Sequence, residues 1–114
     1  MQHSLLLLLE ARKQGRISLE KIVDKACHAP AECFQIKERG YLREGYYADF
    51  VLLDLQGETT VKKDNLLYRC CWSPLEGQTF PGRIHSTYVN GHCVYALGSI
   101  LEGSRGQRLE FQRD

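Results

Sequence analysis

The sequence predicts an α+β chain, with helices in its first third and β-strands after about residue 37. Before residue 37 the apolar residues recur at the spacing of one helix face. After it, glycine turns separate runs of β-branched and aromatic residues. Asn90-Gly91 lies between two of these runs, and this dipeptide favours a two-residue hairpin turn because both positions of a type I′ turn need a positive φ.

The first helix is predicted to end at about Gln14. Gly15 follows two basic residues, Arg12 and Lys13, and glycine commonly comes directly after the last turn of a helix. The helix has apolar positions that suit a buried face: Leu5, Leu8, Leu9 and Ala11.

A second helix of about eight residues is predicted after Ser18, which is a favourable N-cap, with Glu20 in the first turn. It has one apolar stripe: Leu19, Ile22, Val23 and Ala26. Pro30 is then expected in the first position of a separate short helical turn, because a helix tolerates proline there.

Residues 47–54 are so continuously apolar that they predict an interior strand, and Gln56-Gly57-Glu58 is expected to end it. A second short strand is predicted over residues 59–61. Residues 84–89 and 92–95 are the two arms of the predicted hairpin, and residues 62–83 are expected to be mostly loop.

The composition excludes several classes of function. Fifteen basic against fourteen acidic residues leave a formal charge of +1 with no basic stripe, so neither nucleic acid nor a membrane surface is expected as a partner. The apolar run of residues 5–9 is too short for a signal peptide or a membrane span. Five cysteines without a CxxC pair predict free thiols in a reducing compartment, which favours a cytoplasmic location.

No complete catalytic or metal site is recognisable in the sequence. Cys27, His28 and Cys33 come nearest to a zinc ligand set, but packing at a helix end explains them better. His85 and His92 could face each other across the hairpin, where pairing on a strand surface explains them without a function. We therefore predict no catalytic residue and no metal ligand in this chain.

Two aspartates, Asp49 and Asp54, flank the apolar strand. A buried aspartate in such a place is expected to accept backbone N–H groups of a turn rather than to act as a general base.

Several ordered motifs resemble the C-terminal end of the amidohydrolase superfamily. The stretch Gly40 to Asp54 resembles its G-x-I-x-x-G-x-x-ADLV-x-x-D pattern, and Ala29 to Phe34 its helical PA-x-x-F/L turn. Val89 to Tyr95 is similar to the closing V-x-G-x-x-V-Y hairpin. Within the superfamily, Trp72 to Gly77 and the leading Gln2-His3-Ser4-Leu5 are most similar to bacterial dihydroorotases.

The resemblance implies a fragment of a larger fold, a (β/α)8 barrel beside a small β-sandwich. Residues 1–37 would supply the last barrel helices, residues 38–102 the C-terminal share of the sandwich, and residues 103–114 a flexible tail. The sandwich strands from the other chain end would be missing, which would leave an unpaired β edge. Ala29 stands where relatives commonly have asparagine, so the turn before Pro30 is expected to lose a helix cap.

The resemblance also implies a function for the parent enzyme. A zinc-activated hydroxide would attack the ring amide of dihydroorotate to give N-carbamoyl-L-aspartate, a reaction of pyrimidine biosynthesis. The zinc ligands of the family precede this segment, so the chain would be a scaffold that is inactive alone and binds the N-terminal remainder of the enzyme. His3 is the one residue implied to lie near the substrate, and a homo-oligomer is possible.

Three other interpretations remain open. The chain would be the tail of an allantoinase or hydantoinase, a free-standing β-rich binding module, or a zinc-binding mini-domain built on Cys27, His28 and Cys33.

Overall fold

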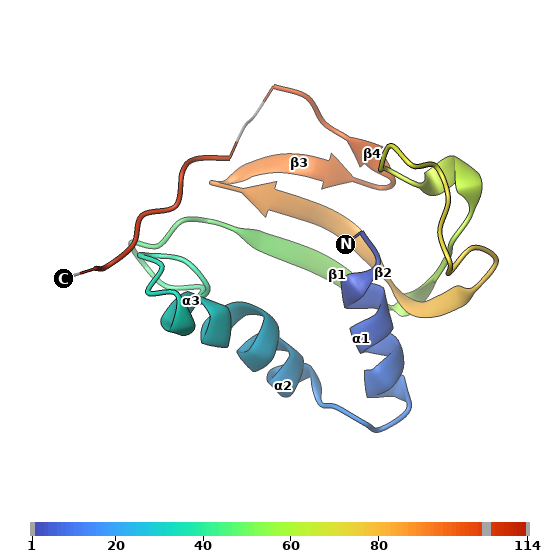
Figure 1. Cartoon of the computed structure of the whole chain (residues 1–114), viewed down its shortest axis with the longest axis horizontal. Helices are drawn as coiled ribbons and strands as arrows, with labels where there is room; N and C mark the ends of the chain where they lie inside the picture. The colour runs from blue at the N-terminus through green and yellow to red at the C-terminus, as the bar shows by residue number, and fades with distance from the viewer. Residues whose placement is uncertain (1, 104–105, 114) are drawn as a thin grey trace. The chain divides into compact units, whose positions relative to one another are not determined.

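A computed structural model describes residues 2–103 and 106–113 of the chain (Figure 1). Its helices are α1 (Ser4–Lys13), α2 (Leu19–Val23), the π-helical turn η1 (Asp24–His28), α3 (Ala29–Cys33) and the 3-10 turn η2 (Lys63–Asn65). Its strands are β1 (Phe50–Thr60), β2 (Thr79–Val89), β3 (His92–Ala96) and β4 (Ser99–Ile100). The α+β class is confirmed.

The four strands form one sheet in the order β1-β2-β3-β4, and β3 pairs antiparallel with both of its neighbours. The chain divides into two compact units. The first comprises residues 1–18 and 53–83, and the second residues 19–52 and 84–114, so β1 and β2 contribute residues to both.

In the first unit, α1 ends as predicted, with Gln14 at its C-cap and Gly15 at a φ of 73°. The apolar stripe is shifted from the expected one, because Leu6 and Leu9 are the buried leucines of α1. Val61 and Phe80 are also buried in this unit.

In the second unit, α2, η1 and α3 follow one another without a break, so the predicted separation of the helices is wrong. Pro30 does lie in the first turn of the short helix α3, as expected. Pro30 has no N–H to donate to the carbonyl of Ala26, and the wide π-turn directly before it relieves the crowding of its ring. Ala29 has helical φ and ψ angles and follows helical His28, so no cap is needed at this point. The expected loss of a cap there is also wrong.

The strand β1 differs from prediction. It begins at Phe50 rather than at residue 47, and it continues through Gly57 to Thr60, so it includes most of the second strand predicted over residues 59–61. Within it, the Asp54 carboxylate accepts the N–H groups of Gln56 and Gly57. The strand is also an edge strand of the described sheet rather than an interior one. A continuous apolar run indicates that both strand faces suit burial, but it does not identify which residues cover them.

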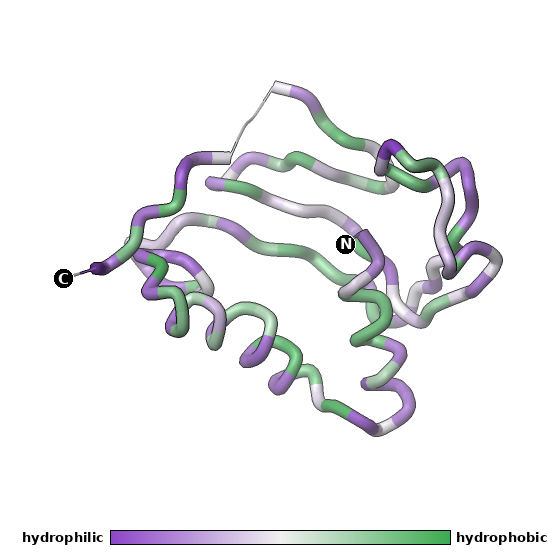
Figure 2. The backbone as a smooth tube through the Cα atoms, viewed as in Figure 1, coloured by the Kyte–Doolittle hydropathy of each residue, from purple (hydrophilic) through white to green (hydrophobic). Residues whose placement is uncertain are grey.

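Apolar side chains are exposed along β1, notably Val51, Leu52 and Leu55. Figure 2 shows hydrophobic colour along much of this strand. Among the described residues, a hydrogen-bonded neighbour lies on one side of β1 only.

The predicted hairpin turn is confirmed, but its first arm is longer than expected, because β2 begins at Thr79, within the range predicted to be mostly loop. Asn90 and Gly91 have φ angles of 50° and 78°, as a type I′ turn requires, and Val89 pairs with His92 (Figure 1). A register shift between Thr87 and Tyr88 offsets the two arms farther along.

The tail predicted over residues 103–114 is described in part. Residues 104, 105 and 114 lie outside the described residues. Phe111 forms an isolated antiparallel bridge with Ile36, and the Lys37 N–H donates to the Glu110 carbonyl at 2.9 Å. The mobility of this segment and the domain limits at residues 37 and 102 stay predictions.

Candidate functional site

His3, the one residue with an expected role near a substrate, lies at the N-cap of α1 in the first unit. Its carbonyl accepts the Leu7 N–H at 3.1 Å, the first hydrogen bond of the helix. His3 is 8% exposed, and its imidazole meets the Tyr68 ring edge-on, with the ring centroids 6.3 Å apart. His3 is thus packed against the segment that follows η2.

Gln2 fastens the same segment beside His3. Its amide donates to the Asn65 carbonyl at 2.9 Å, and its side-chain oxygen accepts the Leu67 N–H at 2.8 Å. One side chain satisfies two backbone groups of an irregular segment, which fixes residues 65–68 against the start of α1. Sequence reasoning missed this contact, because nothing in a polar Gln2 indicates a partner 63 residues away.

Burial lowers the pKa of the His3 imidazole from its ordinary value of 6.5. Removing a cation from water costs free energy, so the folded chain favours the neutral ring. At neutral pH the imidazole is therefore a hydrogen-bonding group rather than a charge.

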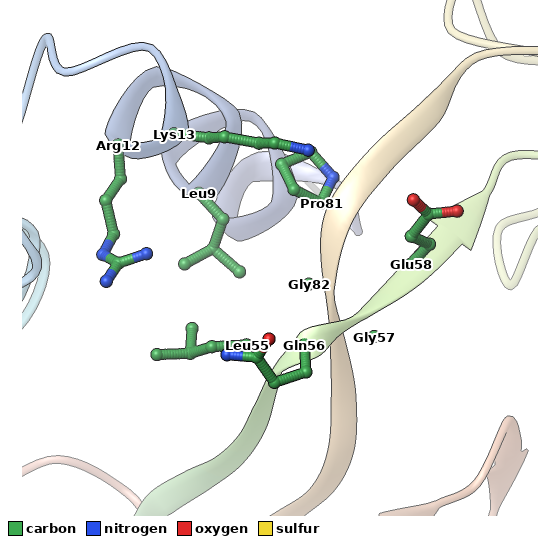
Figure 3. A pocket seen from close by; sticks show the side chains of 9 residues that line it. All are labelled: Leu9, Arg12, Lys13, Leu55, Gln56, Gly57, Glu58, Pro81 and Gly82. Carbon is green, nitrogen blue, oxygen red and sulfur yellow. The ribbon is translucent and has the colours of Figure 1, made fainter.

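A cavity of about 240 Å³ lies elsewhere in the first unit, between the C-terminal half of α1 and the strands β1 and β2 (Figure 3). Leu9 points from α1 toward the strand that carries Leu55 and Gln56. Apolar groups, two cations and one carboxylate line the cavity: Leu9, Arg12, Lys13, Leu55, Gln56, Gly57, Glu58, Pro81 and Gly82. This lining suits a small group that is partly apolar and anionic, but it holds no nucleophile paired with a base.

The second unit contains a polar cluster centred on Asp49. Its carboxylate pairs with the Arg39 guanidinium and accepts the Asn90 N–H at 2.8 Å. Arg39 also stacks on the Tyr47 ring, 4.0 Å from the centroid, and donates to the Asn90 side-chain oxygen at 3.3 Å. The expected structural role of Asp49 is confirmed.

Asp54 has the other structural role that the sequence predicted. Besides accepting the two N–H groups in β1, its carboxylate pairs with Arg83 at 3.3 Å. The contribution of both arginines was missed, because the sequence does not show which aspartate lies near which arginine.

The other histidines are not brought together. His28 lies against the loop after α3, with Nδ1 2.6 Å from the Gly40 carbonyl and its ring stacked on Tyr41. The idea that His85 and His92 face each other is wrong, because the two-residue turn pairs His92 with Val89. His85 lies near the far end of this arm, where its carbonyl accepts the Leu97 N–H.

Across residues 2–103 and 106–113, no three His, Cys, Asp or Glu side chains gather as a metal site requires. The described residues therefore do not fit the zinc centre that the resemblance implies. In the same ranges, no helix combines the length and the apolar content that crossing a bilayer requires.

Comparison with known proteins gives consistent results. A sequence-family model described as "Amidohydrolase family" matches residues 1–94. A dihydroorotase of Pyrococcus furiosus is 35% identical over 103 residues, which cover 90% of this chain and 25% of that protein. An allantoinase of Desulfitobacterium hafniense is 34% identical over 103 residues, with 90% and 23% covered.

Among solved structures, the L-hydantoinase (dihydropyrimidinase) of Arthrobacter aurescens is similar with a TM-score of 0.77 and 33% identity. The match covers 87% of this chain and 22% of that one. The chain thus spans about a quarter of the length of the curated relatives it matches.

Proposed function

The chain belongs to the amidohydrolase family, and on that premise we propose that it is the C-terminal part of a dihydroorotase. The complete enzyme would hydrolyse dihydroorotate to N-carbamoyl-L-aspartate in pyrimidine biosynthesis. The observation that carries the proposal is the alignment of 90% of the chain with one quarter of a dihydroorotase. The likeness to bacterial dihydroorotases stays part of the proposal, and the relative from Pyrococcus furiosus extends the similarity beyond bacteria.

The proposed role of this chain is to support the active site of the complete enzyme. Its described acidic residues with assigned partners serve the fold, since Asp49 and Asp54 are occupied by arginines and backbone N–H groups. The complete enzyme is proposed to hold zinc in a (β/α)8 barrel, but these residues do not fit a zinc site. We therefore assign no step of the hydrolysis to this chain, which is proposed to be inactive alone.

His3 is the proposed point of contact with the substrate region. Burial, which lowers the pKa of His3, and packing against Tyr68 support a neutral imidazole held in one position. A neutral ring can offer a hydrogen bond to a polar ring substrate without adding charge.

The proposed partner is the N-terminal remainder of the enzyme, with a homo-oligomer as a further possibility. The exposed apolar residues of β1 and its single described neighbour support an added strand at this edge. Five free cysteines support a cytoplasmic location for the enzyme.

The proposal is tested by grafting this chain into the Pyrococcus furiosus dihydroorotase in place of the 103 aligned residues. We expect the chimera to bind zinc and hydrolyse dihydroorotate, and the chain alone to do neither. Substituting His3 by alanine in the chimera should raise KM more than it lowers kcat, while Tyr68→Phe keeps the ring contact and serves as the control. Hydrolysis by the isolated chain, or a folded chimera that lacks zinc, would contradict the scaffold role.

A second candidate is part of an allantoinase or hydantoinase. The allantoinase is 34% identical, almost equal to the dihydroorotase, and the similar solved structure is a hydantoinase. The same graft into the Desulfitobacterium allantoinase distinguishes the two. Activity restored only in the allantoinase would overturn the assignment to dihydroorotase.

A further inference from the structure

Two adjacent thiols, Cys70 and Cys71, are exposed in the segment between η2 and β2. Among the described residues, the hydrogen-bond partners of both sulfurs are backbone carbonyls of the same turn. Cys70 Sγ lies 3.7 Å from the Trp72 carbonyl, and Cys71 Sγ lies 3.3 Å from the Arg69 carbonyl. Thiols are weak donors, so a ligand that replaces these contacts sacrifices little free energy.

The segment that carries the thiols is fastened on both sides. Before it, Gln2 holds Leu67 through the backbone N–H at 2.8 Å. After it, buried Ser73 accepts the Leu75 N–H at 3.1 Å, and the Gly77 N–H donates to the Val61 carbonyl at 2.8 Å. The thiols are therefore exposed on a turn whose ends are fixed.

The local geometry disfavours a disulfide between these two residues. Adjacent Cα atoms are about 3.8 Å apart across a trans peptide, below the roughly 4.4–6.8 Å that disulfides usually span. Cys71 also has a φ of 54°, so its backbone is already in the left-handed region that residues other than glycine rarely adopt. An atom that bonds to both sulfurs removes the need for a direct S–S bond, and the ring that it closes is larger.

We propose that Cys70 and Cys71 form a two-thiol binding site for trivalent arsenicals that carry one organic group. Such a compound, R–As(OH)2, condenses with two thiols. Two As–O bonds break, two As–S bonds form, and each thiol proton leaves with one hydroxide as water. Arsenic stays trivalent, so no oxidant or reductant is required, and soft thiol ligands match this soft centre.

The remaining cysteines lack this arrangement. Cys27 and Cys33 are separated by five residues, and Cys93 has no cysteine beside it in the sequence. The pair also has its own reporter, since Trp72 is the one tryptophan of the chain and is 62% exposed.

The test is a titration of the reduced full chain with phenylarsine oxide. Binding is monitored by Trp72 fluorescence and by mass spectrometry of the intact chain. We expect one arsenical per chain and a fluorescence change that saturates at one equivalent. A small dithiol should reverse both signals, and the same concentration of a monothiol should not. No binding, or full reversal by the monothiol, would overturn the proposal.

Variants locate the site. Cys70→Ser and Cys71→Ser should each weaken binding by at least tenfold, because one thiol closes no ring. The double variant Cys27→Ser, Cys33→Ser is the matched control and should bind as tightly as the unaltered chain. If the control variant binds the arsenical more weakly while the two single variants bind it as tightly as the unaltered chain, the site lies at Cys27 and Cys33 and the proposal fails. Far-ultraviolet circular dichroism checks that each variant is folded before binding is compared.

Discussion

Asp49 joins two segments that are distant in the sequence. It receives the Asn90 N–H from the hairpin turn and pairs with Arg39, whose side chain is 10% exposed. The Arg39 Nη2 and Asn90 Nδ2 atoms are buried and without a described hydrogen-bond partner, so the cluster has unused donors, and Asp49 is its charged acceptor. Removing the acceptor leaves a nearly buried cation unpaired.

Asp49→Ala should therefore lower the free energy of unfolding by about 2–4 kcal/mol, as expected for breaking a mostly buried ion pair. Urea unfolding followed by circular dichroism measures the change. Glu110→Ala is the matched control, because the Lys37–Glu110 pair is exposed and 4.0 Å apart and should change stability by less than about 0.5 kcal/mol. Equal effects of the two substitutions would show that burial of Arg39 is unimportant.

His3 should make stability depend on pH. Its pKa is lower in the folded chain than the ordinary value of 6.5, so the unfolded chain binds the proton more readily. Stability from this group is fully present above pH 6.5 and is lost as pH falls toward the folded-state pKa. His3→Gln should remove this component, which is measured as the difference between the urea midpoints of the two proteins across the pH range. If the urea midpoints of the two proteins change with pH in parallel, His3 does not contribute this pH dependence.

At the scale of elements, the backbone at Gly40 lies in close contact with the continuous helix α2–η1–α3. A Cβ atom at this position would lie 2.4 Å from the Ala31 Cβ and 2.7 Å from the Cys27 carbonyl oxygen. Gly40 also has a φ of 85°, which side chains rarely adopt. The loop can thus lie directly on the helix, where its carbonyl meets His28.

Gly40→Ala should be clearly more destabilising than Gly45→Ala. Gly45 has a similar φ of 83° but nothing within 4 Å of its would-be Cβ, so its substitution isolates the backbone strain. That strain costs about 1 kcal/mol, and the clash at Gly40 adds to it. Thermal unfolding of the two variants gives the comparison, and equal loss at both positions would contradict the tight contact.

At the scale of the whole molecule, the chain is about a quarter of the length of its relatives and has an edge strand with exposed apolar residues. Backbone groups at such an edge readily pair with another strand. We expect the isolated chain to self-associate.

Leu52→Lys should shift the chain toward the monomer in sedimentation measurements, since Leu52 is 46% exposed in β1 and a charge there opposes strand addition. Leu42→Lys makes the same change at a residue that is 79% exposed outside the strands and should leave association unchanged. A monomeric unaltered chain at tens of micromolar would contradict the prediction.

The parts of the fold that local chemistry determines could be predicted from the sequence. Gly15 marked the end of α1, and Asn90-Gly91 determined the hairpin turn. The same two-residue turn also determines that His92 pairs with Val89, so the facing of His85 and His92 could have been rejected from the sequence.

The parts that depend on distant partners could not be predicted. The apolar pattern of β1 does not reveal whether a neighbouring strand lies on both sides. Arg39 carries no local signal for its pairing with Asp49, and Gln2 none for its contacts with Asn65 and Leu67. For His3, the resemblance predicted a place near the substrate, but nothing in the sequence indicated its burial against Tyr68.

The contact between Asp49 and Asn90 also affects the kinetics of folding. The hairpin around Asn90 is local and forms in about 1–10 μs, as short hairpins do. Asp49 lies 41 residues earlier, so its bond must wait until a long loop has closed. We therefore expect this bond to form late in folding, so that it chiefly slows unfolding and has little effect on the folding rate.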